Sequence, residues 1–238
     1  MPSLAFITFV KSPIELLLTK QHRKGQRLEQ FLKNPPQRTY VDSSEIHNHH
    51  WEVLHKRPLE TSARSAAATL SDGIFTLSLL GRDLLIDSKK RLFSWADGRG
   101  DNVSFQEALA AISYLANAIE TEPAGEWISF REIPGGEGFF RGPHAIATKS
   151  IERRFGENPR GLAEAALKLG GKEEEGGDSS VSLFALPRAP FLIVLWGGDD
   201  EEPARATMLT DRRIHLHMPL DVIWALTNIT ISNLIRGG

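Results

Sequence analysis

Five side chains in the stretch EWISFREIPGGEGFF are candidates for binding a ligand: Trp127, Arg131, Glu132, Phe139 and Phe140. Arg131 could anchor an anion, Glu132 could transfer a proton, and the aromatic rings could cover an apolar ring system. The alternative is structural, because neighbours on a strand face opposite sides of a sheet. One of the two charges would then turn inward into a buried ion pair, and the phenylalanines would fill the core. We expect a structural role first and a pocket second.

A pair of histidines, His215 and His217, is the second candidate site. On a strand, the two-residue period places both imidazoles on one face. There they could supply half of a divalent metal site or an axial ligand of a tetrapyrrole. A third ligand is not identified, and the candidates are His144, Asp199, Asp200 and Glu201. The alternative is a solvent-facing strand with two ordinary histidines, since spacing alone is a weak signal.

Two further clusters are interpreted as surface features. The segment HNHHWEVLH, residues 47–55, has four histidines but lacks the H-E-x-x-H order of a zinc protease. We interpret it as part of an irregular extension, with a docking arm or adventitious metal binding as alternatives. The acidic run in LWGGDDEEP lacks the spaced ligands of a calcium loop, and it predicts the solvated rim of a hairpin. The sequence contains no Walker loop, dinucleotide fingerprint or G-x-S-x-G elbow.

Composition excludes several classes of function. The chain has 238 residues, a formal net charge of −2 and no cysteine. It therefore has no disulfide, no cysteine nucleophile and no iron–sulfur cluster held by its own thiolates. The near-neutral charge gives no reason to expect nucleic acid or an anionic membrane as a partner. Because no apolar run approaches the roughly 20 residues of a membrane-spanning helix, we expect a soluble, cytoplasmic protein.

Charge and composition divide the chain near residue 58. The first 60 residues carry a net charge of +3 and five of the eight histidines, whereas the remainder is acidic. We predict an N-terminal extension over residues 1–58. It comprises an apolar strand or docking segment at 1–10, a helix that begins with the capping box at residues 12–15, and a polar linker over residues 34–58.

Residues 59–238 predict an α+β domain in which a mostly antiparallel sheet is covered by helices. Strands and helices do not alternate as regular units, and most strand links are short. A hairpin is predicted around Gly81-Arg82, and a capping box from Ser104 to Glu107 begins an amphipathic helix. We predict extended chain at 127–130, strands at 181–185, 191–196, 206–209 and 214–218, and helices at 142–155, 159–169 and from Pro219.

Several motifs occur in an order that resembles a known family. They are FTLSLLGRDLLI, GEWISFREIPGG, RRFGENP, ALKLGG, DSSVSLFALPRAPFLIVLWGGDDEEP and the strand-Pro-helix around HLHMPLD. Together they resemble the family domain of unknown function 3786 over roughly three quarters of the chain. The resemblance implies a protein of anaerobic bacteria or archaea. Some relatives carry a four-cysteine, cluster-binding segment of the kind found in corrinoid iron–sulfur proteins, which this cysteine-free chain lacks.

Three functions follow as hypotheses. The first is a non-catalytic ligand- or cofactor-binding or accessory protein of anaerobic metabolism. It would hold a small anionic ligand or a tetrapyrrole or corrinoid cofactor, or it would dock onto a partner enzyme. The second is a metal-assisted enzyme in which His215 and His217 hold a divalent ion and Glu132 is the general base. The third is a structural subunit whose basic arm, residues 1–58, wraps a protein partner.

Overall fold

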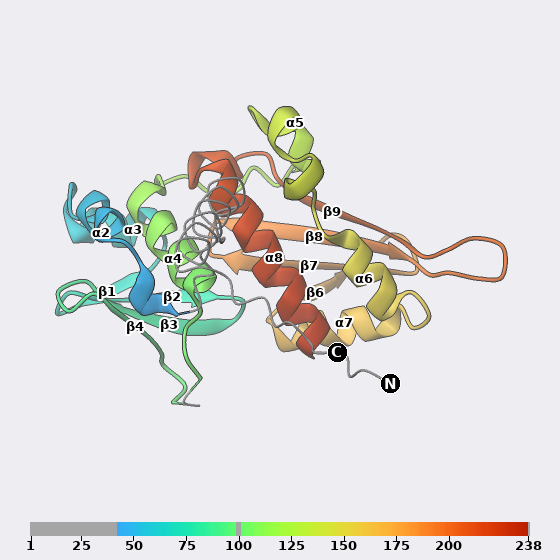
Figure 1. The fold of residues 1–238 in the computed structure, drawn as a ribbon, viewed down its shortest axis with the longest axis horizontal. Coiled ribbons are helices and arrows are strands. Elements are labelled where there is room, and N and C mark those ends of the chain that lie inside the picture. The colour runs from blue at the N-terminus through green and yellow to red at the C-terminus, as the bar shows by residue number, and fades with distance from the viewer. Residues whose placement is uncertain (1–41, 99–100, 238) are drawn as a thin grey trace, which may run out of the picture. The chain divides into compact units, whose positions relative to one another are not determined.

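Two antiparallel sheets organise the computed structural model, which describes residues 42–98 and 101–237 (Figure 1). The four-stranded sheet has the order β1-β2-β3-β4, and the five-stranded sheet has the order β5-β9-β8-β7-β6. The first sheet consists of β1 (Thr69–Ser71), β2 (Ile74–Leu79), β3 (Arg82–Asp87) and β4 (Leu92–Trp95). The second consists of β5 (Trp127–Ile128), β6 (Lys172–Glu174), β7 (Ser179–Leu186), β8 (Ala189–Trp196) and β9 (Arg205–Asp211).

Helices pack against both sheets, so the predicted α+β class is confirmed (Figure 1). Over one face of the five-stranded sheet lie α6 (Thr148–Phe155), α7 (Arg160–Lys168) and α8 (Leu220–Gly237). Beside the four-stranded sheet lie α2 (Asn48–Leu54), α3 (Leu59–Ser65) and α4 (Phe105–Asn117). The remaining short helices are η1 (Ser43–Glu45), η2 (Phe130–Glu132), α5 (Gly136–Phe139), η3 (Gly142–His144) and η4 (Ile214–Leu216).

The most regular local patterns formed the elements that they predict. The helix α4 begins at the capping box, where the Glu107 carboxylate accepts a hydrogen bond from the Ser104 N–H at 2.9 Å. The guanidinium of Arg57 donates to the carbonyls of Leu115 and Ala118 at the other end of this helix. Because α4 contacts α2, α3 and α8, it joins the helices of the two sheets.

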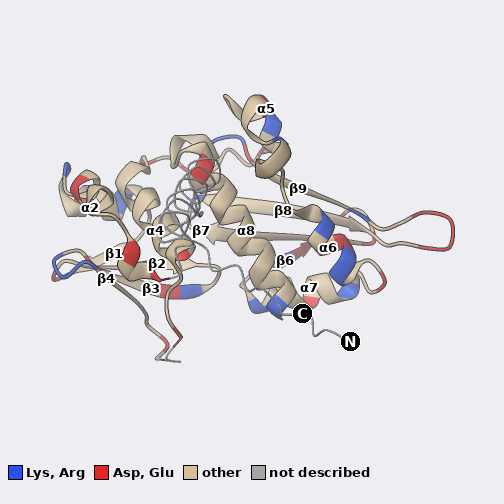
Figure 2. Ribbon diagram, in the orientation of Figure 1, with Lys and Arg blue, Asp and Glu red and all other residues tan. Residues whose placement is uncertain are grey.

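The long strands β7, β8 and β9 contain the predicted strands at 181–185, 191–196 and 206–209; burial alternates along most of β8 and β9, whereas β7 is buried almost throughout. On β8, Phe191, Ile193 and Leu195 face the helices and are fully buried. The acidic run after β8 forms the exposed β8–β9 connection, as the sequence predicts (Figure 2).

Two segments outside the predicted site residues differ from the sequence prediction. The predicted helix over residues 142–155 divides into η3 and α6. The histidine-rich segment, predicted as part of an irregular extension, instead forms α2. Trp51 and Leu54 of this helix are buried, and the Trp51 ring lies 5.1 Å from that of Phe93 on β4. The polar histidines dominate the local pattern, but the two apolar residues spaced three apart are sufficient to anchor one helical face. The predicted segment at 1–10 and the helix from residue 12 lie outside the described residues.

The two sheets meet at the β2–β3 turn. Leu80 and Gly81 both have left-handed backbone angles, with φ of 50° and 74°, as a two-residue hairpin turn requires. The Leu80 N–H donates to the Ala185 carbonyl of β7 at 3.0 Å. A Cβ atom on Gly81 would lie 2.8 Å from the Leu169 carbonyl oxygen, so this close approach requires glycine.

We expect Gly81→Ala to lower the free energy of unfolding by about 3 kcal/mol, because the added methyl group would force the turn away from the chain at Leu169. The control is Gly125→Ala, since Gly125 has a nearly identical φ of 73° but open space around its Cα. The control isolates the left-handed backbone cost of about 1 kcal/mol. Urea denaturation measures both, and equal losses would contradict the assigned contact.

Candidate functional site

The segments that carry the predicted site residues lie side by side. Strand β5 pairs antiparallel with the end of β9, and Trp127 is opposite Asp211. Next to this pair, the Arg212 guanidinium contacts the Glu126 carboxylate, with Nε and Oε2 2.6 Å apart. The fold therefore places residues 126–128 beside residues 210–212, and because the pairing is antiparallel, residues 131 and 215 lie in opposite directions from it along the two segments.

Arg131 and Glu132 do not take the predicted positions. Both side chains are exposed, so the expectation that one turns inward is wrong. The extended chain ends at Ile128, and the two residues lie in the 3₁₀ helix η2, where the two-residue alternation of a strand does not apply. The Glu132 carboxylate accepts a hydrogen bond from the Ser129 N–H at 2.7 Å and caps this short helix.

The three candidate aromatic residues of the same segment separate into core and surface. Phe140 is buried, with its ring 5.4 Å from Phe130 and 5.1 Å from Phe139. Phe139 is half-buried and stacks on His144 with ring centroids 4.5 Å apart. Trp127 remains 38% exposed on β5. The phenylalanines thus pack with other aromatic rings at the α5 corner, whereas Trp127 presents its indole to solvent.

His215 and His217 lie on and just after η4, so the predicted strand at 214–218 is wrong. A 3₁₀ helix has three residues per turn, which points side chains two apart in different directions. Accordingly, His215 is half-buried and its Nδ1 lies 3.0 Å from the Arg212 carbonyl oxygen, whereas His217 is fully buried. Within residues 42–98 and 101–237, no group of three or more His, Asp or Glu side chains could hold a metal ion.

The fold encloses a group of four polar side chains, which we call the polar centre: Tyr114, Arg188, Asp211 and His217. Arg188 lies in the turn between β7 and β8, and its guanidinium contacts the Glu122 carboxylate and, through Nε, the Ser65 carbonyl at 2.8 Å. Its backbone N–H donates to the Tyr114 hydroxyl at 3.1 Å, and that hydroxyl donates to the Ala66 carbonyl. Burial raises the pKa of Tyr114, which therefore acts as a neutral hydrogen-bonding group.

The carboxylate of Asp211 fixes the loop before β5. It is buried and accepts hydrogen bonds from the N–H groups of Ala124 at 2.9 Å, Gly125 at 2.7 Å and Arg213 at 2.9 Å. Three donors to one buried carboxylate compensate its loss of hydration. This arrangement ends β9 and aligns β5 against it.

The imidazole of His217 is the exception in the polar centre. Both ring nitrogens are buried, and neither has a hydrogen-bond partner among residues 42–98 and 101–237. The ring lies 6.2 Å from that of Tyr114. Burial, with the nearby Arg188 charge as a second cause, lowers the pKa of His217 to about 4. At neutral pH the ring is therefore uncharged.

Sequence reasoning did not identify Arg188 as a site residue. The signal was present in the motif LPRAP, where one charged residue interrupts two apolar strands. A charged residue in a turn between two buried strands is either exposed to solvent or buried with hydrogen-bond partners. The sequence does not identify the partners of Arg188, because Ser65 and Tyr114 lie far from it along the chain.

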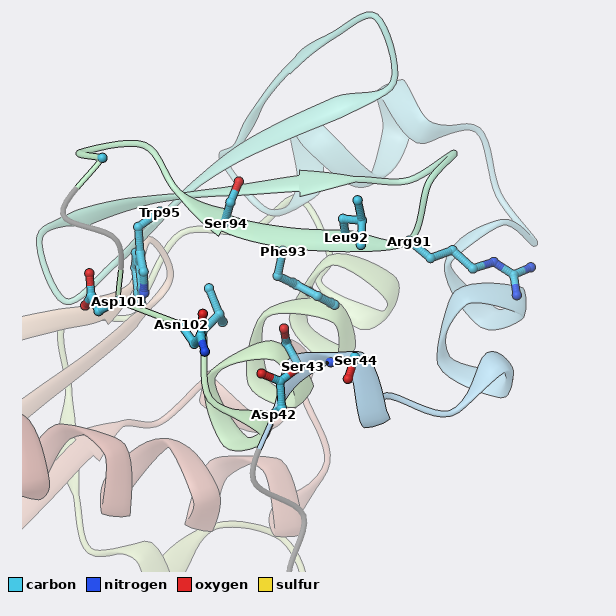
Figure 3. A pocket seen from close by; sticks show the side chains of 12 residues that line it. Asp42, Ser43, Ser44, Arg91, Leu92, Phe93, Ser94, Trp95, Asp101 and Asn102 are labelled. Atoms are coloured by element: carbon cyan, nitrogen blue, oxygen red, sulfur yellow. Dashed lines mark hydrogen bonds between the residues drawn. The ribbon is translucent and has the colours of Figure 1, made fainter.

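A cavity of about 430 Å³ lies along β4, away from the polar centre (Figure 3). One wall is β4 with Arg91, and the other is formed by Asp42, Ser43, Ser44, Asn102 and Val103. The second wall is held together because the Ser43 N–H donates to the Val103 carbonyl at 3.2 Å and Asp42 forms a bridge with Ser104.

Side chains of both walls face this cavity. Phe93 and Trp95 point from β4 toward the opposite wall, and Ser43 points back toward β4, whereas Ser94 points away (Figure 3). The guanidinium of Arg82 lies 4.1 Å from the Trp95 ring and also binds Asp97 and Asp101. The indole of Trp95 is thereby held in place by a cation–π contact.

The fold defines a two-sheet α+β domain with a buried polar centre and a cavity at a sheet edge. The chain belongs to the family described as Domain of unknown function (DUF3786), whose model matches residues 58–233. No curated protein and no solved structure matches the chain. In the part of the chain that the structure describes, no helix has the length and apolar character needed to cross a membrane.

We expect His217 to make stability depend on pH. Above pH 6.5 the imidazole is neutral in both the folded and the unfolded chain, and protonation does not lower the free energy of unfolding. As the pH falls from 6.5 to about 4, the unfolded chain binds a proton that the folded chain does not accept, so the free energy of unfolding decreases by about 3 kcal/mol.

The measurement is urea denaturation of the natural chain and of His217→Leu across this pH range. The variant should lose about 3 kcal/mol less than the natural chain on acidification. The control, His215→Leu, removes a half-buried histidine and should keep the natural dependence. Identical pH profiles for all three chains would contradict a buried neutral His217.

Proposed function

We propose that this chain is a binding or accessory protein whose ligand occupies the cavity beside β4. The observation that carries the proposal is the cavity itself: its volume of about 430 Å³ and its mixture of aromatic and hydrogen-bonding walls. Ligand sites typically enclose about 300–1,000 Å³, with apolar walls and a few polar groups that orient the ligand.

The lining favours an organic ligand with an apolar surface and hydrogen-bonding groups. Phe93, Trp95 and Val103 supply the apolar contacts, and Ser43 and Asn102 supply hydroxyl and amide groups. The described lining residues include no His, Met or Tyr that could be the axial ligand of a tetrapyrrole iron or cobalt. This site therefore supports binding of a metal-free organic group more than tetrapyrrole ligation.

Two other cavities have lining that fits this role less well. One, of about 530 Å³, lies between α3 and the β1–β2 turn, and the other, of about 570 Å³, lies between α6 and the β8–β9 connection. Neither includes an aromatic side chain, and the second is rimmed by exposed carboxylates, including Asp199 and Asp200.

The His-x-His pair does not favour a metal-assisted enzyme. His217 is buried, and among the described residues no second imidazole is directed toward it, since His215 contacts the Arg212 carbonyl instead. Glu132, the general base of that hypothesis, caps η2 through the Ser129 N–H. Binding without chemistry is thus the function that the geometry supports best, and anaerobic metabolism remains the setting that the family resemblance favours.

A thermal-shift screen with small organic molecules and linear peptides tests the proposal. A ligand at a concentration of 100 Kd stabilises the folded chain by about 2.7 kcal/mol, which raises Tm by about 5–10 °C in a protein of this size. We expect such a shift for the natural chain and none for Ser43→Trp, because the new indole fills the cavity.

The matched control is Ser78→Trp, which adds the same ring at an exposed position on β2 outside the cavity. It should respond to the ligand as the natural chain does. A compound that stabilises Ser43→Trp as strongly as the natural chain binds elsewhere, and that result would refute the assigned site.

A further inference from the structure

The edge of β4 has unpaired backbone groups. In an antiparallel pair, alternate residues bond to the neighbouring strand, and the residues between them direct their N–H and C=O groups to the other side. The Ala96 N–H donates to the Asp83 carbonyl at 2.9 Å, and Ala96 follows Trp95, which lies opposite Leu84. This register makes Ser94 a residue that bonds to β3, and it turns the backbone groups of Phe93 and Trp95 away from the sheet.

These groups lie along the free edge of β4, on two residues that line the cavity. The far wall, Asp42–Ser44 and Asn102–Val103, lies across from Phe93 and Trp95 (Figure 3). Its own backbone pairing is internal, because Ser43 bonds to Val103. Within the described chain, no residue forms a backbone hydrogen bond with the outward groups of Phe93 or Trp95.

The other edge strands are shorter or protected. The edge strand β6 has the sequence KEE, and charged side chains prevent a sheet edge from pairing with another chain. Strand β5 has two residues, and β1, at the far edge of the first sheet, has three. Strand β4 has four residues and is the longest edge strand in the described residues. Its sequence, LFSW, carries no charge.

We propose that the ligand of the cavity is an extended segment of a partner protein that adds a strand to the free edge of β4. This inference rests on the proposed function, because it takes the cavity as the binding site. An extended main chain presents donors and acceptors at a two-residue period, which is the spacing from Phe93 to Trp95. A small molecule with one or two polar groups cannot form hydrogen bonds with the outward N–H and C=O groups of both residues.

The register also defines the chemistry of the segment. Side chains that lie opposite Phe93 and Trp95 in a new strand point to the same face of the sheet, toward Val103 and Ser43. These positions are two residues apart and adjoin aromatic rings. The partner segment therefore has apolar residues at alternate positions, and its intervening side chains point to the opposite face of the sheet.

Amide hydrogen exchange on the full chain, with peptides selected from a displayed library of linear sequences, tests this inference. A selected peptide should slow exchange at the Phe93 and Trp95 amides by about tenfold or more, as expected for newly formed strand hydrogen bonds. The internal control is the Ser94 amide, which already bonds to β3 and should not change. Methylating one backbone nitrogen of the peptide at a time should abolish binding at every second residue and leave it unchanged at the residues between. The variant Ser43→Trp should bind none of the peptides.

The outcomes separate this inference from the proposed function. Small molecules that bind in the cavity while no peptide is enriched would leave the proposed function intact and overturn the strand addition. Protection of Phe93 and Trp95 in the free chain would show that this chain covers its own edge, and protection that increases with protein concentration would indicate a second copy; either result overturns a partner strand. If no ligand of either class binds, both proposals fail.

Discussion

A buried guanidinium links the two halves of the domain. Arg188 lies in the β7–β8 turn of the five-stranded sheet; its guanidinium donates to the Ser65 carbonyl at the end of α3, and its backbone N–H donates to the hydroxyl of Tyr114 in the last turn of α4. These helices pack beside the four-stranded sheet. Because a buried charge without partners costs several kcal/mol, the turn and the two helices can occupy few positions relative to each other. Asp211 has the same effect on the loop before β5, through three backbone donors.

The cavity depends on this arrangement, although it lies outside the polar centre. The helix α4 carries Tyr114 in its last turn and is capped at its start by Ser104, and Ser104 forms a bridge with Asp42 in the far wall of the cavity. On the other side, Trp51 of α2 packs on Phe93 of β4. The separation of the two walls is therefore set by helices that Arg188 and Tyr114 hold in place, and a rigid groove loses less entropy on binding than a mobile one.

Local patterns in the sequence predicted several elements because the interactions that form them are local. The capping box at Ser104, the left-handed turn at Gly81 and the alternation in β8 each depend on residues a few positions apart. The same reasoning failed at residues 214–218, where Ile, Leu and Met alternate with two histidines as they would on a strand. A strand also needs a neighbour, and β9 ends at Asp211, whose carboxylate binds the loop before β5 and the Arg213 N–H.

The sequence by itself determined the α+β class, the family, most strand and helix positions, and the absence of any cysteine chemistry. Only the tertiary structure decided that Arg131 and Glu132 are exposed, that His217 is buried while His215 is not, and that Arg188 lies at the centre. It also placed Asp42 and Ser43 opposite Phe93 and Trp95 across a cavity. The physical reason is that the burial and the hydrogen-bond partners of a side chain depend on which segments of the chain meet in space. Arg188 and Tyr114, and Asp42 and β4 in the two walls of the cavity, are separated in the sequence by several helices and strands, so a local sequence pattern cannot predict that they meet.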